Sequence, residues 1–272
     1  MALNLPGPLA CARLRELGAA VTKVEPPAGD PFERFCPGWY RRLHNGMEVV
    51  SLDLKSDPGR KAFGGMLGDA DLLVTAQRAS ALERLRLDPA QLARNHPRLC
   101  HVAITGHAAP HDEVPGHDLT YLAAEGLVSP PELPRTLYAD VSGAERAVSI
   151  ALALLVSRLR SGKAAAAQAP LADAASALSQ PLHEGLTRPG ALLGGGAAGY
   201  NLYAARDGWV AVAALEPHFA KALAEKLQLR ELTAEALGRH FATRDARYWE
   251  DWARVHDLPI VAVRDPQSTT SR

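Results

Sequence analysis

The N-terminal part of the chain alternates short apolar runs with amphipathic segments, and this order limits the fold more than any other feature. Four apolar runs are expected strands: Ala20–Val24, Glu48–Leu54, Asp71–Thr75 and Leu99–Thr105. Three segments that follow a proline or an N-cap acid are expected helices: Pro6–Leu17, Pro58–Leu67 after Asp57, and Ala90–Asn95 after Asp88. This β-α-β-α order predicts an α/β fold with a doubly wound, mostly parallel sheet.

The second half of the chain predicts a smaller domain after a glycine-rich linker. Val141–Arg160 is expected to be one long helix that ends at Gly162, whereas Lys163–Ala177 is compatible with either a strand or a helix. We place a large domain at 1–185, a linker at 186–199 and a small α+β domain at 200–272. The elements expected in the small domain are Trp209–Leu215 and Ile260–Val263 as strands, and Glu216–Leu227, Ala234–Phe241 and Ala246–Val255 as helices.

Composition argues against several classes of function. Lys plus Arg and Asp plus Glu both number 30, so the formal net charge is zero, and the basic excess typical of a nucleic-acid binder is missing. The three cysteines, Cys11, Cys36 and Cys100, lack the paired spacing of a zinc site. No run approaches the roughly 20 apolar residues of a membrane span. We therefore expect a cytoplasmic protein with no metal, no nucleic-acid partner and no membrane partner.

One glycine cluster resembles a dinucleotide-binding motif without its structural setting. Gly194–Gly199 fits the spacing GxGxxG, but it follows a Pro-Gly loop and precedes Tyr200–Tyr203, which does not begin like a helix. The motif needs a strand before it and a helix after it, so that the pyrophosphate meets a helix N-terminus. We interpret the cluster as part of the linker.

A histidine and an acid are the candidate chemical centre. His117 opens a predicted helix within Gly116–Tyr121, and Asp140 stands alone in the apolar run Leu137–Val141. A base and an acid of this kind are what proton transfer or carboxylate nucleophilic catalysis requires. On the residues alone, a single histidine near a helix start is more often structural.

Several separated blocks together resemble the family III CoA-transferases (the CaiB/BaiF superfamily), which include the α-methylacyl-CoA racemases. The blocks are Leu5–Pro8, Leu17–Glu25 with Gly29-Asp30, Ser51–Lys55, Ala70-Asp71, Ala81–Arg84, Asn95–Leu99, Gly116–Tyr121, Arg158 with Ser161–Lys163, Asp207-Gly208 and Glu216-Pro217. These blocks are spread over most of the chain, and it is their order and spacing together that carry the resemblance. The resemblance implies an enzyme that binds acyl-CoA in a cleft of a Rossmann-like large domain.

The resemblance also implies the residues that bind CoA. CoA would be part of the substrate, with no permanently bound cofactor. Lys55 and Arg84 are cations suited to its phosphates, Arg84 as a two-pronged donor. The full set of implied contacts is Leu5, Pro6, Leu52, Asp53, Leu54, Lys55, Ala76, Gln77, Arg78, Arg84, Gly116, Asp118 and Tyr121.

Three activities remain open at this point. In the racemases, the histidine and aspartate at the positions of His117 and Asp140 exchange the α-proton of an acyl-CoA, with Glu216 in a block typical of racemases. This activity requires a protonated Asp140, whose pKa the apolar Leu137 and Val141 would raise. In the transferases, the matching acid is a nucleophile. The third alternative is a truncated, non-catalytic CoA-binding or partner subunit.

The resemblance implies an interlocked homodimer in which residues 200–219 of one chain, with Glu216, complete the cleft of the other. The sequence also departs from the family pattern at two places. Most of the first strand that precedes the Pro-Gly-Pro turn is missing before Leu5. The C-terminal return to the large domain is missing too, since the polar end Gln267–Arg272 does not resemble it. Missing segments of this kind would expose a sheet edge and apolar surface.

Overall fold

The computed structural model describes residues 1–265, and the chain divides into two compact units, Met1–Ser179 and Gln180–Arg272. The division falls within helix α9 (Leu171–His183), ahead of the predicted glycine-rich linker. The polar end Gln267–Arg272 lies outside the described residues.

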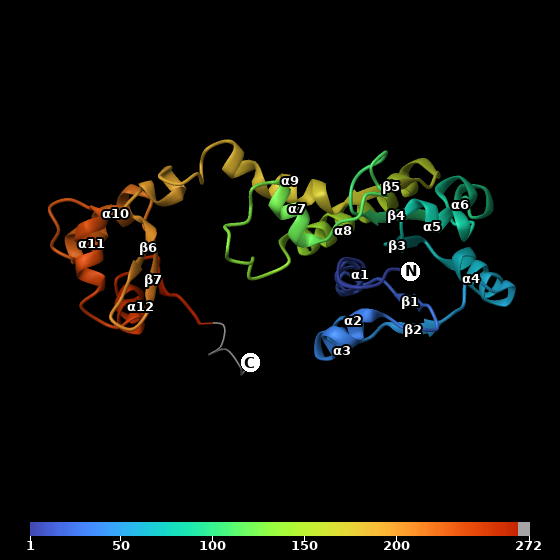
Figure 1. Cartoon of the computed structure of the whole chain (residues 1–272), viewed down its shortest axis with the longest axis horizontal. Coiled ribbons are helices and arrows are strands. Elements are labelled where there is room, and N and C mark those ends of the chain that lie inside the picture. The colour runs from blue at the N-terminus through green and yellow to red at the C-terminus, as the bar shows by residue number, and fades with distance from the viewer. Residues whose placement is uncertain (266–272) are drawn as a thin grey trace. The chain divides into compact units, whose positions relative to one another are not determined.

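The first unit contains parallel strands, as predicted, but they form two sheets (Figure 1). β1 (Thr22–Glu25) pairs with β2 (Glu48–Ser51). The second sheet has the order β3-β4-β5, from β3 (Leu72–Thr75), β4 (Cys100–Thr105) and β5 (Ala166–Pro170). All four predicted strands occur, and β5 lies in the segment that the sequence left undecided. The α/β class with parallel strands is therefore confirmed, although the strands described here do not form one continuous sheet.

Helices connect and cover these strands. Their bounds are α1 Pro6–Glu16, α2 Pro31–Phe35, α3 Pro37–His44, α4 Asp57–Asp69, α5 Ala79–Arg84, α6 Pro89–Asn95, α7 Asp118–Ala124 and α8 Tyr138–Ser161. Two details correct the sequence predictions. Ser56, and not Asp57, caps α4, because the Ser56 hydroxyl accepts the Gly59 N–H. Helix α8 begins at Tyr138, so Asp140 lies in its first turn and not in an apolar run ahead of it.

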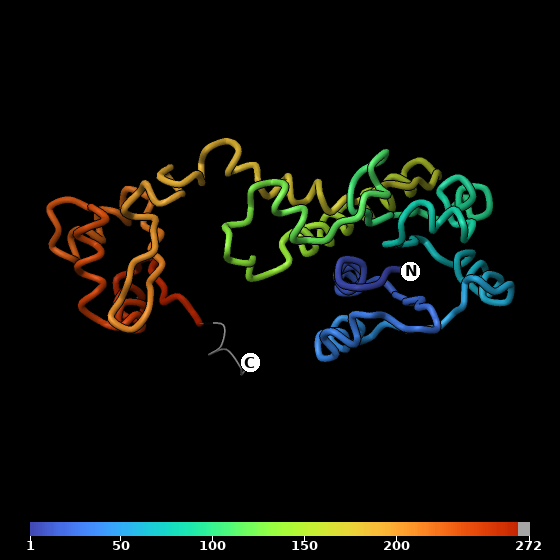
Figure 2. The backbone as a smooth tube through the Cα atoms, in the orientation of Figure 1, coloured from blue at the N-terminus to red at the C-terminus, as the bar shows by residue number. Residues whose placement is uncertain are grey.

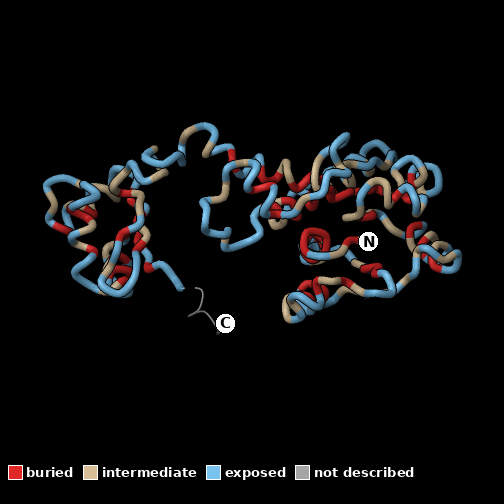
Figure 3. Tube along the Cα trace, viewed as in Figure 1, coloured by how far each residue is buried: buried red, intermediate tan, exposed pale blue. Residues whose placement is uncertain are grey.

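The main core of this unit lies between α1, α8 and one face of the β3-β4-β5 sheet. Val102 and Ile104 of β4 pack there against α1 and α8, and most of α1 is buried (Figure 3). Gly143 permits the close approach of α8 and α9, since a Cβ at that position would lie 2.3 Å from the Leu171 side chain. The opposite face of β3 contributes to a second cluster with α4, α5 and α6.

A buried lysine holds the turns around β1 together. The Lys23 ammonium lies 2.6 Å from Asp30, 2.8 Å from Glu25 and 2.8 Å from Nε2 of His44. His44 Nδ1 donates to the Tyr40 carbonyl, and burial lowers the pKa of His44, so Nε2 is free to accept from the lysine. All three ammonium protons therefore have partners in a site that excludes water. The sequence did not predict this network.

The second unit is a small antiparallel sheet covered by helices. Its strands, in the order β6-β7-β8, are β6 (Tyr200–Ala204), β7 (Trp209–Ala213) and β8 (Ile260–Ala262). The helices are α10 (Pro217–Lys226), α11 (Ala234–Phe241) and α12 (Ala246–Val255). Phe241 and Trp249 lie at the centre of its own hydrophobic core. Glycines of the predicted linker form the irregular turn η1 (Leu192–Gly196), and β6 follows it, so the dinucleotide motif lacks its helix.

The Lys23 network predicts a large effect from losing its only cation. Lys23→Met keeps the length of the side chain but leaves the buried carboxylates of Glu25 and Asp30 without a charge partner, which should cost about 3–5 kcal/mol in the free energy of unfolding. Denaturant titration measures this loss. The exposed Lys221→Met, which breaks a pair with Glu225, is the control and should change stability by less than about 0.5 kcal/mol. Equal effects of the two substitutions would contradict the structural role.

Candidate functional site

His117 lies at the start of α7, in the connection that leaves the carboxyl end of β4. It is the N-cap residue of α7, with an extended backbone and an exposed side chain. Its backbone N–H donates to the Thr120 hydroxyl over 3.0 Å, and its carbonyl accepts from the Thr120 N–H over 2.8 Å. These contacts fix the backbone of the turn, from which the imidazole is exposed to solvent.

Glycines on both sides of this connection make room for a buried tyrosine. A Cβ at Gly116 would lie 2.4 Å from the Tyr121 ring, and a Cβ at Gly106 would lie 2.5 Å from its hydroxyl. Tyr121 is 3% exposed, and its ring packs edge-on against His107. Gly116 therefore precedes His117 because the turn passes directly over the tyrosine.

Asp118 joins the starts of two helices. Its Oδ1 accepts the backbone N–H of Ala139 over 2.7 Å and that of Asp140 over 3.0 Å, although the residue itself belongs to α7. A long loop separates α7 from α8 along the chain (Figure 2), and this carboxylate brings its two ends together. The contact places the first turn of α8, with Asp140, beside the His117 turn. The sequence did not predict this role.

The carboxyl of Asp140 is unusual because it stays partly protonated near neutral pH. Burial raises the pKa of Asp140 from its ordinary value of 3.8 to about 7, and the nearby charge of Asp118 adds to the shift. Of the apolar neighbours expected to cause this shift, Leu137 is 42% exposed, whereas Val141 packs against the core. Asp140 in turn contributes to the raised pKa of Tyr121.

The residues expected to bind CoA differ in how far they are buried. Some are held in the interior, where they are available mainly through their backbone: Leu5 and Pro6 are buried at the start of α1, and Leu52 and Leu54 are partly buried against the second hydrophobic cluster. Asp53, Lys55, Arg78 and Arg84 are exposed, whereas Ala76 and Gln77 are half-buried. Asp53 also accepts the Lys55 N–H, which shapes the turn that leads into α4.

Two of the exposed cations lie close to one carboxylate. The pKa of Glu113 is lowered, first by the Ser80 N–H that it accepts, and also by the charges of Arg78 and Arg84. The segment that carries Arg78 and the segment that carries His117 both follow carboxyl ends of neighbouring parallel strands, β3 and β4. They therefore share one edge of the sheet, where α/β proteins bind ligands.

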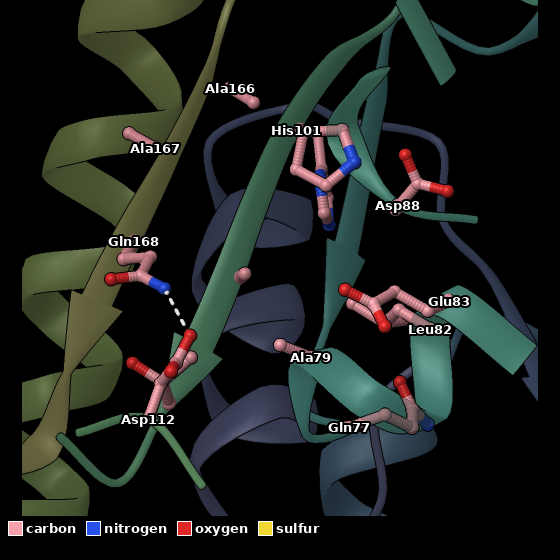
Figure 4. Close-up of a pocket in the computed structure, with 13 residues that line it drawn as sticks. Gln77, Ala79, Leu82, Glu83, Asp88, His101, Asp112, Ala166, Ala167 and Gln168 are labelled. Carbon is pink, nitrogen blue, oxygen red and sulfur yellow. Dashed lines mark hydrogen bonds between the residues drawn. The ribbon is translucent and has the colours of Figure 1, made fainter. Parts of the chain in front are cut away.

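A cavity of about 270 Å³ lies on the face of β4 and β5 that is opposite α8 (Figure 4). Of the predicted CoA contacts, Gln77 lines it, and His117 and Asp140 do not. His101 and Thr105 line this cavity, and the buried Nδ1 of His101 and hydroxyl of Thr105 have no hydrogen-bond partner. Burial lowers the pKa of His101 to about 4, so its imidazole is neutral.

Other features concern different parts of the chain. Glu216 is an exposed N-cap residue of α10 in the second unit, and its role in catalysis stays a prediction. Glu25, Asp30 and His44 have the spacing of metal ligands, but the Lys23 ammonium already contacts all three. Among residues 1–265, no helix is long and apolar enough to cross a membrane. The homodimer and the cytoplasmic location also stay predictions.

Solved structures support the fold. A crystal structure from Mycobacterium tuberculosis superposes with a TM-score of 0.81 at 23% identity, over 99% of this chain and 83% of that one. A CaiB/BaiF family protein from Brucella suis superposes with a TM-score of 0.79 at 20% identity, over 98% of this chain and 84% of that one. The mixed α/β architecture with parallel sheets is therefore that of CaiB/BaiF proteins.

Sequence comparison identifies the family. The α-methylacyl-CoA racemase of Homo sapiens is 30% identical over 83% of this chain, which spans 62% of the racemase. A subunit of succinyl-CoA:(R)-benzylsuccinate CoA-transferase from Thauera aromatica is 31% identical over 77% of this chain and 57% of its own length. The chain thus spans only about three fifths of these relatives. Because the profile of CoA-transferase family III matches residues 1–272, the chain belongs to this family.

Proposed function

We propose that this protein exchanges the proton on the α-carbon of an acyl-CoA, with His117 and Asp140 as its two acid–base groups. A thioester acidifies its α-carbon, but a positioned base still has to take the proton near neutral pH. Return of a proton to the opposite face of the enolate requires an acid. The raised pKa of Asp140, about 7, carries the proposal, because an ordinary aspartate has no proton to give at that pH.

The two groups have environments that suit opposite roles. His117 is exposed on a turn whose backbone is fixed by Thr120, so its imidazole can meet a substrate that enters from solvent. Asp140 is half-buried at the start of α8, where burial disfavours the carboxylate. An exposed histidine that can accept a proton and a carboxyl that keeps one are the two groups that proton transfer of this kind requires.

CoA transfer to an acceptor carboxylate is the second candidate. Relatives named as CoA-transferases favour it, among them cinnamoyl-CoA:phenyllactate CoA-transferase of Clostridium sporogenes. Position in the first turn of α8 also favours it, because the positive end of a helix dipole stabilises a carboxylate. A nucleophilic Asp140 must be ionised, however, and a pKa near 7 leaves about half of it protonated at pH 7. We therefore prefer proton transfer.

Protonation of Asp140 predicts how stability depends on pH. The native state holds this proton up to about pH 7, whereas the unfolded chain loses it near 3.8, so the stabilising contribution falls as pH rises through that window. Asp140→Asn removes the term. Its unfolding free energy relative to wild type should rise by roughly 2–3 kcal/mol between pH 5 and pH 8, as measured by urea titration. A constant difference across this range would mean that Asp140 titrates normally.

Isotope exchange tests the reaction. A 2-methylacyl-CoA incubated with the protein in heavy water should gain deuterium at its α-carbon, because each base exchanges its proton with solvent. His117→Ala should slow exchange from one stereoisomer by roughly 10²–10⁴-fold more than from the other, since each base serves one face. His111→Ala, in the same connection, is the matched control and should exchange normally. Mass spectrometry measures the uptake.

A different result of that experiment would support the second candidate. Turnover that requires an acceptor acid, with a CoA or acyl adduct trapped on Asp140 and no deuterium uptake, would overturn the proton-transfer proposal in favour of CoA transfer.

CoA recognition by the exposed cations is tested separately from the chemistry. Arg84→Ala should weaken CoA binding roughly tenfold to a hundredfold at low salt, because a charge-assisted contact to a phosphate is lost. The effect should shrink at high salt, where ions already screen the contact. Arg94→Ala removes an exposed arginine from α6 and should leave the dissociation constant unchanged. Calorimetry at two salt concentrations decides, and an unchanged affinity of Arg84→Ala at low salt removes Arg84 from the site.

A further inference from the structure

Helix α8 lacks a cap in its own sequence. Its N-cap residue is Leu137, whose side chain has no oxygen to accept the N–H groups of the first turn. One of these groups belongs to Ala139, which is fully buried, so water does not replace the missing acceptor. Oδ1 of Asp118 accepts it over 2.7 Å and also accepts the N–H of Asp140 over 3.0 Å. The cap of α8 is therefore supplied by α7.

The capping carboxylate is itself buried next to the candidate acid. Asp118 is 4% exposed and directly follows His117 in the chain. Its contact to the backbone of Asp140 brings a negative charge close to the carboxyl of that residue, and like charges disfavour ionisation. One side chain thus has two separable physical properties: an oxygen that accepts two N–H groups, and a charge.

We propose that Asp118 is a positioning residue for the proposed proton transfer: its oxygen fixes the first turn of α8 beside the His117 turn, and its buried negative charge, next to the backbone of Asp140, adds to the effect of burial in disfavouring ionisation of that carboxyl. This inference rests on the proposed function for its catalytic meaning. The geometric part stands on the two hydrogen bonds alone. The family resemblance implied a different role for Asp118, namely a contact to CoA.

Few other ionisable groups act on Asp140. Burial is the largest cause of its raised pKa, and Asp118 is the charge that adds to it. Tyr121 of α7 has its own pKa raised, mainly by burial and partly by Asp140, while Arg78 acts on the tyrosine in the opposite direction. His107 packs against the Tyr121 ring. Removal of the Asp118 charge should therefore lower the pKa of Asp140 without returning it to the ordinary value.

Two substitutions separate the oxygen from the charge. Asp118→Asn keeps an acceptor oxygen at the same position and removes only the charge. Asp118→Ala removes both, and leaves the N–H of Ala139 without a partner in a buried site. The melting temperature should fall by roughly 2–8 °C in Asp118→Ala and by much less in Asp118→Asn.

The decisive readout is the titration of Asp140 itself, followed by NMR of ¹³C-labelled aspartate carboxyls in the full chain. The resonance of Asp140 is assigned by its disappearance in Asp140→Asn. In Asp118→Asn its midpoint should move down by roughly one pH unit, because a neighbouring like charge has been removed. The alkaline limb of the α-proton exchange rate in heavy water should move in the same direction.

Asp88 provides a matched control because its Oδ1 also caps a helix, in this case from the N-cap position of α6 itself, where it accepts the Gln91 N–H. Asp88→Ala should lower the melting temperature, and neither Asp88→Ala nor Asp88→Asn should move the Asp140 midpoint. An unchanged midpoint in a stably folded Asp118→Asn would overturn the electrostatic part of the proposal. Equal destabilisation by Asp118→Asn and Asp118→Ala would overturn the capping part.

The same experiments distinguish failure of the proposed function. A shifted Asp140 midpoint in Asp118→Asn, together with no α-proton exchange by the wild-type protein, would support the positioning of Asp140 and reject proton transfer as its purpose.

Discussion

The candidate site depends on two N–H groups that α8 cannot satisfy by itself. Leu137 precedes the helix and offers no acceptor, so the buried N–H of Ala139 would be left without a partner if Asp118 were absent. An unsatisfied group of this kind costs about 1–3 kcal/mol, which is a large part of the stability of a domain. The requirement fixes Asp118 against α8, and the adjacent His117 is fixed with it. The hydrogen bonds to the backbone thereby determine which two turns lie side by side.

Close packing around the turn supports the same arrangement. Tyr121 fills the space beside Gly106 and Gly116, where any side chain would collide with the ring or its hydroxyl. Asp140 lies close enough to add to the raised pKa of Tyr121, and burial is the main cause of its own raised pKa. The apolar environment and the capping charge act in the same direction. The chemistry proposed for Asp140 is therefore a consequence of how the turn packs.

Local patterns in the sequence predicted the elements well and their assembly less well. Helix α11 was predicted with the bounds that it has, because Thr233 caps it and its apolar face is regular. The start of α8 was placed too late, because its cap comes from Asp118, which is distant in the chain and gives no local signal. Strand β5 was left undecided because Ala166–Pro170 is mostly alanine, which favours no face.

The candidate site was likewise predicted in its residues and not in its three-dimensional contacts. His117 and Asp140 were identified through the family resemblance, and the structure explains why they lie near one sheet edge. The Lys23 network escaped prediction because Lys23, Asp30 and His44 come from separate elements and meet only after folding. The residues predicted to contact CoA also differ in burial: Leu5 and Pro6 are buried, whereas Lys55 and Arg84 are exposed. No periodicity in the sequence indicates which of these residues are buried and which are exposed.

The most direct test of two-base proton transfer is a crystal structure of the protein with a 2-methylacyl-CoA bound. We expect the α-carbon to lie between the imidazole of His117 and the carboxyl of Asp140, on opposite faces and at roughly 3–3.5 Å from each reacting atom. A complex in which Asp140 instead faces the thioester carbonyl carbon, with His117 remote from the α-carbon, would contradict it.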